Sequence, residues 1–251
     1  MFKDHFSNHA ASYADARPMY PQKLFDYLTS LCDEHALAWD CATGNGQAAV
    51  MLAERFKKVI ATDASETQIA HAKPKPNIEY RVATAEASGI SAHTVDLITV
   101  AQALHWFNFD NFFKEVKRVL KPNGILAVWC YELLTTESKW LDQLIMTFYK
   151  EIVGSYWPKE RQYVEEGYRT IEFPFEKIKT PKFFIQPGWD LLQLCNYLST
   201  WSAVKYYEKD KGENPVETWL KPQLKDHFQD LNKKIVITIP LDLIVRQLTD
   251  V

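Results

Sequence analysis

A short turn with two glycines, placed between a predicted strand and a predicted helix, constrains the fold more than any other feature of this chain. Residues 36–41 predict a buried strand, Gly44 and Gly46 follow, and residues 47–56 have the spacing of a helix. Glycine adopts backbone conformations that other residues avoid, and it lets a ligand approach main-chain N–H groups. The turn therefore predicts the first strand–helix unit of an α/β sheet, with a binding site where the helix begins.

Predicted strands and helices alternate along the first half of the chain. Apolar runs predict further strands at residues 58–62, 77–82, 95–101 and 125–131. Amphipathic spacing predicts helices at residues 21–34 and 109–120, and Ser65 suits the N-cap of another helix. This alternation is typical of βαβ units, so we expect a mostly parallel sheet with helices on both faces.

The pattern changes after residue 134. Residues 1–134 are expected to hold an N-terminal cap segment and the first part of a ligand-binding domain. Residues 135–180 are helix-like and aromatic, which predicts a helical insertion that acts as a lid. Residues 181–251 are expected to return to the same sheet, with strands at 182–186 and 234–240 around a helical stretch at 189–207.

Charge and composition exclude several classes of function. The net charge is -3 and the basic residues form no stripe, so nucleic acid is not an expected partner. The chain has no apolar run long enough to span a membrane and no recognisable leader, so we expect a cytoplasmic protein, monomeric or homodimeric. The four cysteines lack the spacing of a zinc site, so no metal is expected.

Two adenosine-containing cofactors suit the glycine turn. The run from Gly44 to Ala49 fits G-x-G-x-x-A, the fingerprint of dinucleotide-binding sites, and Asp63 after the second strand suits a ribose diol in either cofactor. Asp40 discriminates between them, because a carboxylate here would repel a pyrophosphate. The same carboxylate would attract the sulfonium and ammonium groups of S-adenosylmethionine, which therefore fits the turn better.

Six motifs resemble those of a known family. Residues 40–46 match D-x-G-x-G-x-G except at Ala42, residues 83–86 are similar to G-D-A-E except at Ala83 and Thr84, and residues 120–124 are similar to L-K-P-G-G except at Asn123. Residues 13–21 match Y-x-x-x-R-P-x-Y-P, residues 102–107 match Q-A-x-H-W-F, and residues 197–202 match Y-L-x-T-W-S. Over residues 6–131 the chain thus resembles the class I S-adenosylmethionine-dependent methyltransferases, in particular the small-molecule branch with trans-aconitate methyltransferase-like proteins.

The resemblance implies a fold and a set of cofactor-binding residues. The fold would be a Rossmann-like seven-stranded mixed sheet whose last strand is antiparallel, with the helical lid after strand five. Asp63 would bind the ribose hydroxyls, and Arg17 would approach the cofactor carboxylate. The complete implied set is Tyr13, Arg17, Asp40, Ala42, Thr43, Gly44, Gly46, Asp63, Ala64, Ala85, Glu86, Ala101 and Gln102.

The predicted function is methyl transfer to a small molecule, with a carboxylate or hydroxyl group as the acceptor. Tyr20, His105, Trp106, Trp129, Tyr131 and Trp201 are candidates for the acceptor pocket, although aromatic residues equally suit a core. His105 is the candidate catalytic base; alternatively, it packs beside Trp106 and shapes the pocket by hydrogen bonding. An NAD-dependent oxidoreductase and a non-catalytic cofactor-binding module remain as alternatives.

Overall fold

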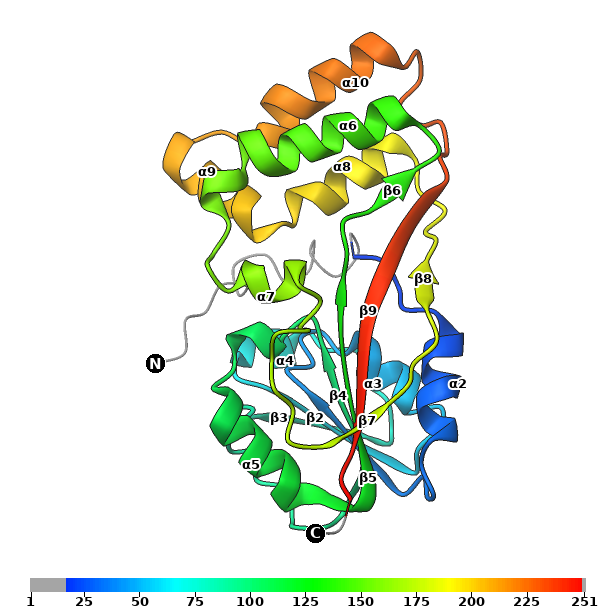
Figure 1. Cartoon of the computed structure of the whole chain (residues 1–251). Helices are drawn as coiled ribbons and strands as arrows, with labels where there is room; N and C mark the ends of the chain where they lie inside the picture. The colour runs from blue at the N-terminus through cyan, green and yellow to red at the C-terminus, as the bar shows by residue number, and fades with distance from the viewer. Residues whose placement is uncertain (1–16, 250–251) are drawn as a thin grey trace.

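A β-sheet forms the lower part of the molecule and a layer of helices lies above it (Figure 1). This arrangement is seen in a computed structural model that describes residues 17–249. The main strands are β1 (Leu37–Cys41), β2 (Lys58–Asp63), β3 (Ile78–Val82), β4 (Val95–Ala101), β5 (Leu120–Tyr131) and β9 (Ile237–Gln247). Three short strands, β6 (Thr135–Thr136), β7 (Glu176–Ile178) and β8 (Phe183–Ile185), complete the sheet.

The strand order confirms the predicted α/β architecture and corrects the number of strands. The order is β3-β2-β1-β4-β5-β9-β6, and β7 and β8 also pair with β9, so the sheet has nine strands rather than seven. β1 to β5 are parallel, whereas β9 is antiparallel to β5, as expected for the last strand. The short strands have two or three residues, which is too few to produce a recognisable alternation of apolar and polar residues.

The last strand lies further along the chain than predicted. The expected strand at 234–240 is wrong at both ends, because β9 runs from Ile237 to Gln247. Alternate residues of β9 from Ile237 to Val245 are buried, which is the pattern of a strand with one face on the core. Pro240 suggested a strand end, but its carbonyl still accepts a hydrogen bond from the Glu132 N–H at 3.0 Å.

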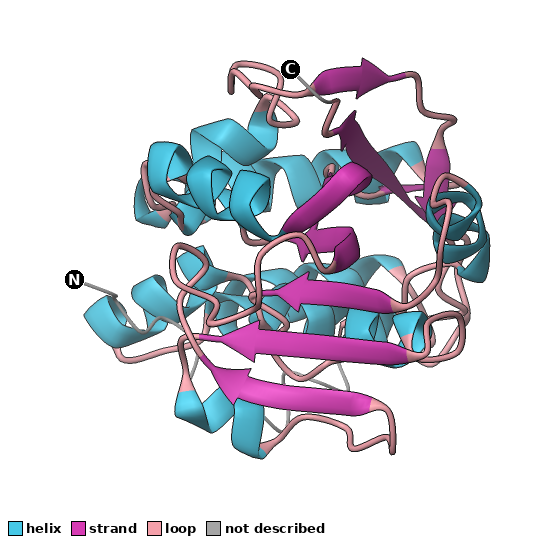
Figure 2. Ribbon diagram, turned by 90° about the horizontal axis from the view of Figure 1, so that it is seen from below, coloured by secondary structure: helices cyan, strands magenta, loops and turns pink. Residues whose placement is uncertain are grey.

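Helices cover both faces of the sheet, as predicted (Figure 2). Residues of α2 (Gln22–Ser30) and α3 (Gln47–Leu52) share one apolar cluster with the sheet, and those of α5 (Phe109–Val119) share a second cluster with its opposite face. Short helices occur at α4 (Glu66–Ala70) and η2 (Leu104–Trp106). The Ser65 hydroxyl accepts a hydrogen bond from the Gln68 N–H, which confirms the predicted N-cap of α4.

The upper layer combines helices from two parts of the chain (Figure 1). The first part contains α6 (Lys139–Thr147), η3 (Phe148–Ile152), η4 (Gly154–Tyr156) and α7 (Arg161–Glu165). The second part contains α8 (Leu191–Ser199), α9 (Ser202–Lys211), η5 (Val216–Leu220) and α10 (Lys221–His227). Buried residues of α6, η3, α8, α9, η5 and α10 join the apolar cluster of the sheet face that carries α2 and α3, whereas Val164 of α7 joins the cluster that contains α5. No helix within residues 17–249 is both long and apolar enough to cross a membrane.

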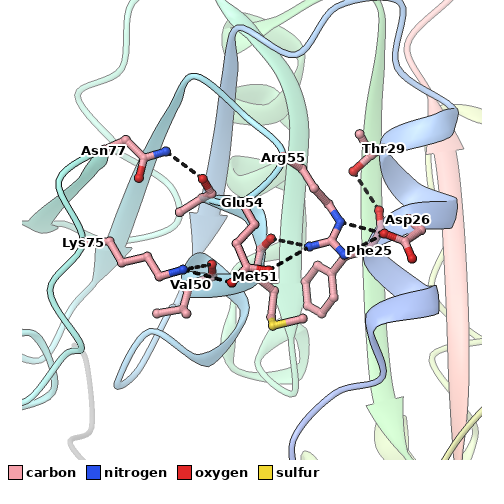
Figure 3. A network of polar contacts seen from close by, with 10 residues as sticks. Phe25, Asp26, Thr29, Val50, Met51, Glu54, Arg55, Lys75 and Asn77 are labelled. Carbon is pink, nitrogen blue, oxygen red and sulfur yellow. Dashed lines mark hydrogen bonds and ion pairs between the residues drawn. The ribbon is translucent and has the colours of Figure 1, made fainter.

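A polar network ties α2, α3 and the segment before β3 together at the side of the sheet (Figure 3). The Arg55 guanidinium donates to the Asp26 carboxylate and to the Met51 carbonyl. Asn77 donates to the main-chain carbonyls of Ala53 and Phe56 at the end of α3. The Met51 and Ala53 carbonyls are groups that the end of α3 leaves without an intrahelical partner, so these bonds hold the end of α3 against α2 and the segment before β3.

The first position of the turn is strained, and this leads to a stability prediction. Ala42 has φ +54°, a left-handed conformation that costs a residue with a Cβ about 1–2 kcal/mol. We expect Ala42→Gly to raise the free energy of unfolding by about 1 kcal/mol in urea denaturation. The control is Ala49→Gly within α3, which we expect to lower that free energy by a similar amount. Destabilisation by Ala42→Gly would show that the strain is absent.

Candidate functional site

The glycine turn joins the carboxyl end of β1 to the first residue of α3. Gly46 is the N-cap of α3 and has φ +86°, and a Cβ at this position would collide with the Tyr80 hydroxyl. The Gly44 N–H donates to Asp63 Oδ2 at 2.9 Å, and the Ser65 N–H donates to Asp63 Oδ1 at 2.9 Å. Asp63 therefore links the turn after β1 with the segment after β2 through both carboxylate oxygens.

Asp40 lies beneath this turn rather than on its surface. Its side chain is 1% exposed and accepts hydrogen bonds from the hydroxyls of Thr43 at 2.5 Å and Thr99 at 2.7 Å. Burial raises the pKa of Asp40 to about 6, with a smaller contribution from the nearby Asp63 charge, although the two hydroxyl bonds oppose the shift. Asp40 is thus mostly ionised at pH 7 and contributes negative charge below the turn.

A cavity of about 770 Å³ opens above the turn, at the carboxyl ends of the parallel strands. We call it the larger cavity. Many predicted cofactor-binding residues line it: Arg17, Ala42, Thr43, Gly44, Asp63, Ala64, Ala85, Glu86, Ala101 and Gln102. Its charged lining within residues 17–249 consists of one arginine and three carboxylates: Arg17, Asp63, Glu86 and Glu160. The wall is therefore predominantly negative, which favours a ligand with positive groups.

A smaller cavity of about 80 Å³ lies next to the larger one, and both are lined by Arg17, Gln102, Trp106 and Tyr131. The helical layer supplies its other side, with Trp157, Arg161, Tyr197 and Trp201. Gln102 lies between the cavities in a left-handed conformation, with φ +59°. Its Nε2 is buried and has no hydrogen-bond partner among residues 17–249. A buried donor without a partner indicates where a ligand oxygen would be stabilised.

Arg161 presents a cation to the smaller cavity. Its guanidinium lies 4.6 Å from the centre of the Trp157 ring, and its Nε donates to the Tyr149 hydroxyl at 2.9 Å. Within residues 17–249, no carboxylate lies close enough to Arg161 to form an ion pair. The Tyr149 hydroxyl in turn donates to Glu165. These contacts hold the guanidinium in place, and its Nη groups remain available to a ligand.

His105 contributes an imidazole to the same cavity. Its Nδ1 lies 2.8 Å from the Tyr168 hydroxyl, and its ring packs 4.6 Å from the ring of Trp106. Burial, with a smaller contribution from the Arg161 charge, lowers the pKa of His105 to about 3. His105 is therefore neutral near pH 7, and a group with such a low pKa is a weak base.

The remaining residues that the sequence predicted for the cofactor or acceptor site occupy several different positions. Asp40 and Gly46 support the turn and line neither cavity, and Tyr13 lies outside the described residues. Tyr20 lines the larger cavity and Trp201 the smaller one. Trp129 is fully buried, packs against Tyr20 at 5.4 Å and lines neither cavity.

Sequence reasoning missed Glu160, Arg161 and Tyr168. All three belong to the predicted insertion, more than 50 residues after the motif at 102–107 that they approach. No spacing within the insertion distinguishes them from its other charged and aromatic residues. The packing of α7 above the strand ends brings Glu160 and Arg161 to the cavities (Figure 1), and the turn after α7 brings Tyr168 to His105.

Comparison with known proteins identifies the family of this fold and site. Residues 39–128 match a family model described as a methyltransferase domain. The chain is 37% identical over 227 residues to a Dictyostelium discoideum protein named as a methyltransferase, covering 88% of this chain and 86% of that protein. A solved structure titled as a type II methyltransferase from Anaeromyxobacter dehalogenans is 34% identical, with a TM-score of 0.86 over 93% of this chain and 99% of that one.

A more distant structure has the same fold with the methyl donor bound. Haemonchus contortus phosphoethanolamine N-methyltransferase 2, in complex with S-adenosyl-L-methionine, superposes with a TM-score of 0.53 at 15% identity. The match covers 97% of this chain and 57% of that protein. Three observations indicate the same family: the sheet order, the negative cavity at the strand ends, and the identity to relatives of similar length. This chain belongs to the class I S-adenosylmethionine-dependent methyltransferases.

Proposed function

We propose that this methyltransferase acts on a small molecule that presents a carboxylate or hydroxyl oxygen, bound in the smaller cavity. The observation that carries the proposal is Arg161, a positioned cation with no carboxylate partner in the described part of the chain. A half-buried charge is costly unless a partner compensates it, and an anionic acceptor would be that partner. Arginine also presents a planar fork of donors that matches a carboxylate.

The residues around the larger cavity fit S-adenosylmethionine. Its volume suits a ligand of this size, and its acidic residues suit a cofactor with a sulfonium and an ammonium group. Asp63 would bind the ribose hydroxyls, while Thr43 and Gly44 would contact the methionine end and Asp40 would act on it from beneath the turn through its charge. The same charges oppose the pyrophosphate of NAD, so they disfavour the oxidoreductase alternative.

The proposed chemistry follows from what the chain holds beside that site. When bound, S-adenosylmethionine supplies an electrophilic methyl group. A carboxylate acceptor is already ionised near pH 7, so it needs no base from the protein. Arg161 and the Gln102 amide would hold its oxygens in place, since precise orientation supplies much of the rate of such a transfer.

The helical layer would act as the predicted lid over this reaction. Trp157 and Trp201 wall the smaller cavity from the side of the helices, and Tyr131 walls it from the sheet. We propose that this aromatic wall excludes water, which favours a transfer that neutralises charge. The insertion at 135–180 and the helices α8 and α9 would then both contribute to the lid.

An acceptor screen tests the proposed function. The full-length protein would be incubated with S-adenosylmethionine and panels of small carboxylic acids, alcohols, phenols and amines, and S-adenosylhomocysteine formation would be measured for each. We expect turnover with carboxylic acids or hydroxyl compounds, and carboxylate products that release methanol in mild base, as methyl esters do. Turnover with amines alone would overturn the proposed acceptor class.

The raised pKa of Asp40 predicts that cofactor affinity depends on pH. Asp40 loses its charge as the pH falls through about 6, so the attraction to the ligand ammonium is present above pH 6 and lost below it. We expect the affinity for S-adenosylhomocysteine to fall by about tenfold between pH 7.5 and 5, the effect of losing one charge–charge attraction of about 1.4 kcal/mol. Asp40→Asn should bind weakly with a flatter profile. An equally steep profile in Asp40→Asn would assign the pH dependence to another group.

A further inference from the structure

Tyr168 occupies an unusual position in the insertion. It is fully buried and has φ +58°, and Gly167 before it also has φ +58°. A Cβ at residue 167 would collide with the Asp242 carboxylate on β9, so glycine allows this close approach. Left-handed conformations of bulky residues cost free energy and persist where surrounding contacts enforce them. This turn directs the Tyr168 hydroxyl to His105.

The hydrogen bond between these side chains has a defined direction. Burial raises the pKa of the Tyr168 hydroxyl well above its usual value, so the phenol keeps its proton. Within residues 17–249, the only acceptor that this hydroxyl meets is His105 Nδ1, at 2.8 Å. A buried hydroxyl that did not donate would lose a hydrogen bond at a cost of about 1–3 kcal/mol. Tyr168 therefore donates its proton to Nδ1.

The direction of this bond determines what His105 presents to the smaller cavity. The imidazole is neutral, because burial and the Arg161 charge lower its pKa to about 3. A neutral imidazole carries one proton, and when Nδ1 accepts a hydrogen bond that proton must be on Nε2. Nε2 makes no hydrogen bond to any residue in the range 17–249, and His105 lines the smaller cavity. The available group is thus an N–H donor with no free lone pair.

We propose that Tyr168 is a positioning residue that holds His105 in the Nε2–H tautomer, so that His105 donates a hydrogen bond to an acceptor oxygen instead of removing a proton. Only the identity of the acceptor in this inference rests on the proposed function. Arg161 and the unpartnered Gln102 amide are further donors around the same space, and Glu132 is the one carboxylate in its described lining. Together with Arg17, these donor side chains suit an acceptor that arrives already deprotonated.

Nuclear magnetic resonance tests the tautomer without any acceptor. The 251-residue chain has seven histidines, and long-range proton–nitrogen spectra of a sample with nitrogen-15 histidine separate the two tautomers. The signal of His105 is assigned by its loss in His105→Gln. In the wild type we expect Nε2 to be protonated and Nδ1 unprotonated, without change from pH 8 to pH 5. Protonation of Nδ1, or titration near neutral pH, would overturn the proposal.

Two tyrosine variants separate positioning from packing. Tyr168→Phe removes only the hydroxyl, and we expect its His105 signal to shift toward an average of the two tautomers. Tyr156→Phe is the matched control, because its hydroxyl bonds to Asp210 in the same helical layer and it lines neither cavity. It should leave the His105 signal unchanged. An unchanged signal in Tyr168→Phe would show that the phenol is only a packing group.

Kinetics then connect the tautomer to the reaction. With an acceptor from the screen, Tyr168→Phe should lower kcat/KM about fivefold, the effect of weakening one hydrogen bond, and should leave S-adenosylhomocysteine affinity within about twofold of wild type. An unchanged kcat/KM would contradict the role of His105 as a donor. Failure of the whole acceptor screen would refute the proposed function, but the spectra would still decide the tautomer.

Discussion

Replacing Asp63 with alanine is expected to lower the affinity for S-adenosylhomocysteine by at least about 100-fold. The carboxylate accepts hydrogen bonds from the N–H groups of Gly44 and Ser65, and Asp63 lines the larger cavity, where the ribose would lie. Hydrogen bonds to a charged group contribute about 1.5–3 kcal/mol each, and two of them correspond to about 100-fold or more. Titration calorimetry measures the loss directly.

Two further variants make this result specific. Asp63→Asn keeps one acceptor oxygen, so we expect it to retain part of the affinity. Asp33→Ala removes an exposed carboxylate just before β1, at the opposite end of the sheet, and should bind like the wild type. Wild-type affinity in Asp63→Ala, with the fold intact by circular dichroism, would contradict the assignment of Asp63 to the cofactor.

Replacing Arg161 with glutamine is expected to lower kcat/KM for a carboxylate acceptor by about 10- to 100-fold. The variant removes one of the two arginines that line the smaller cavity, the other being Arg17, and with it a charge-assisted hydrogen bond worth about 1.5–3 kcal/mol. Most of the change should be a raised KM, because Arg161 binds the acceptor in both the ground state and the transition state. Cofactor affinity should change little, since Arg161 does not line the larger cavity.

Two control variants test whether the effect depends on the charge of Arg161 and on its position. Arg161→Lys keeps the charge but not the planar fork, so we expect it to recover only part of the activity. Arg169→Gln removes an arginine of the same insertion whose side chain is 70% exposed, and it should be as active as the wild type. Equal activity of Arg161→Gln and wild type on every carboxylate would exclude an anion-binding role.

The sequence predicted the parts of the fold that depend on long, regular patterns. β1, β2, β4 and the core of β5 are apolar runs, and the turn between β1 and α3 carries a recognisable motif. The sequence also predicted a local conformation. Asn123 adopts φ +62°, which an asparagine in place of glycine tolerates. The larger cavity was predictable because its residues follow the ends of these strands.

The parts that could not be predicted depend on contacts between distant segments. β7 has the sequence Glu-Lys-Ile and is a strand only because β9 lies beside it. Trp129 and Tyr131 lie on the same face of β5. Trp129 is two residues further from the end of the strand, a distance of about 7 Å, and is therefore in the core. Arg161 and Tyr168 reach the site through the path of the insertion, which no local pattern specifies.

The most direct test of the central claim, that the negative cavity above the glycine turn binds the methyl donor, is calorimetric titration of the full-length wild-type protein with S-adenosylhomocysteine and, in parallel, with NAD. We expect stoichiometric binding of S-adenosylhomocysteine and no heat from NAD, because the carboxylates of the cavity attract an ammonium group and repel a pyrophosphate. Binding of NAD alone, or of neither ligand by a folded sample, would contradict the assignment of this cavity.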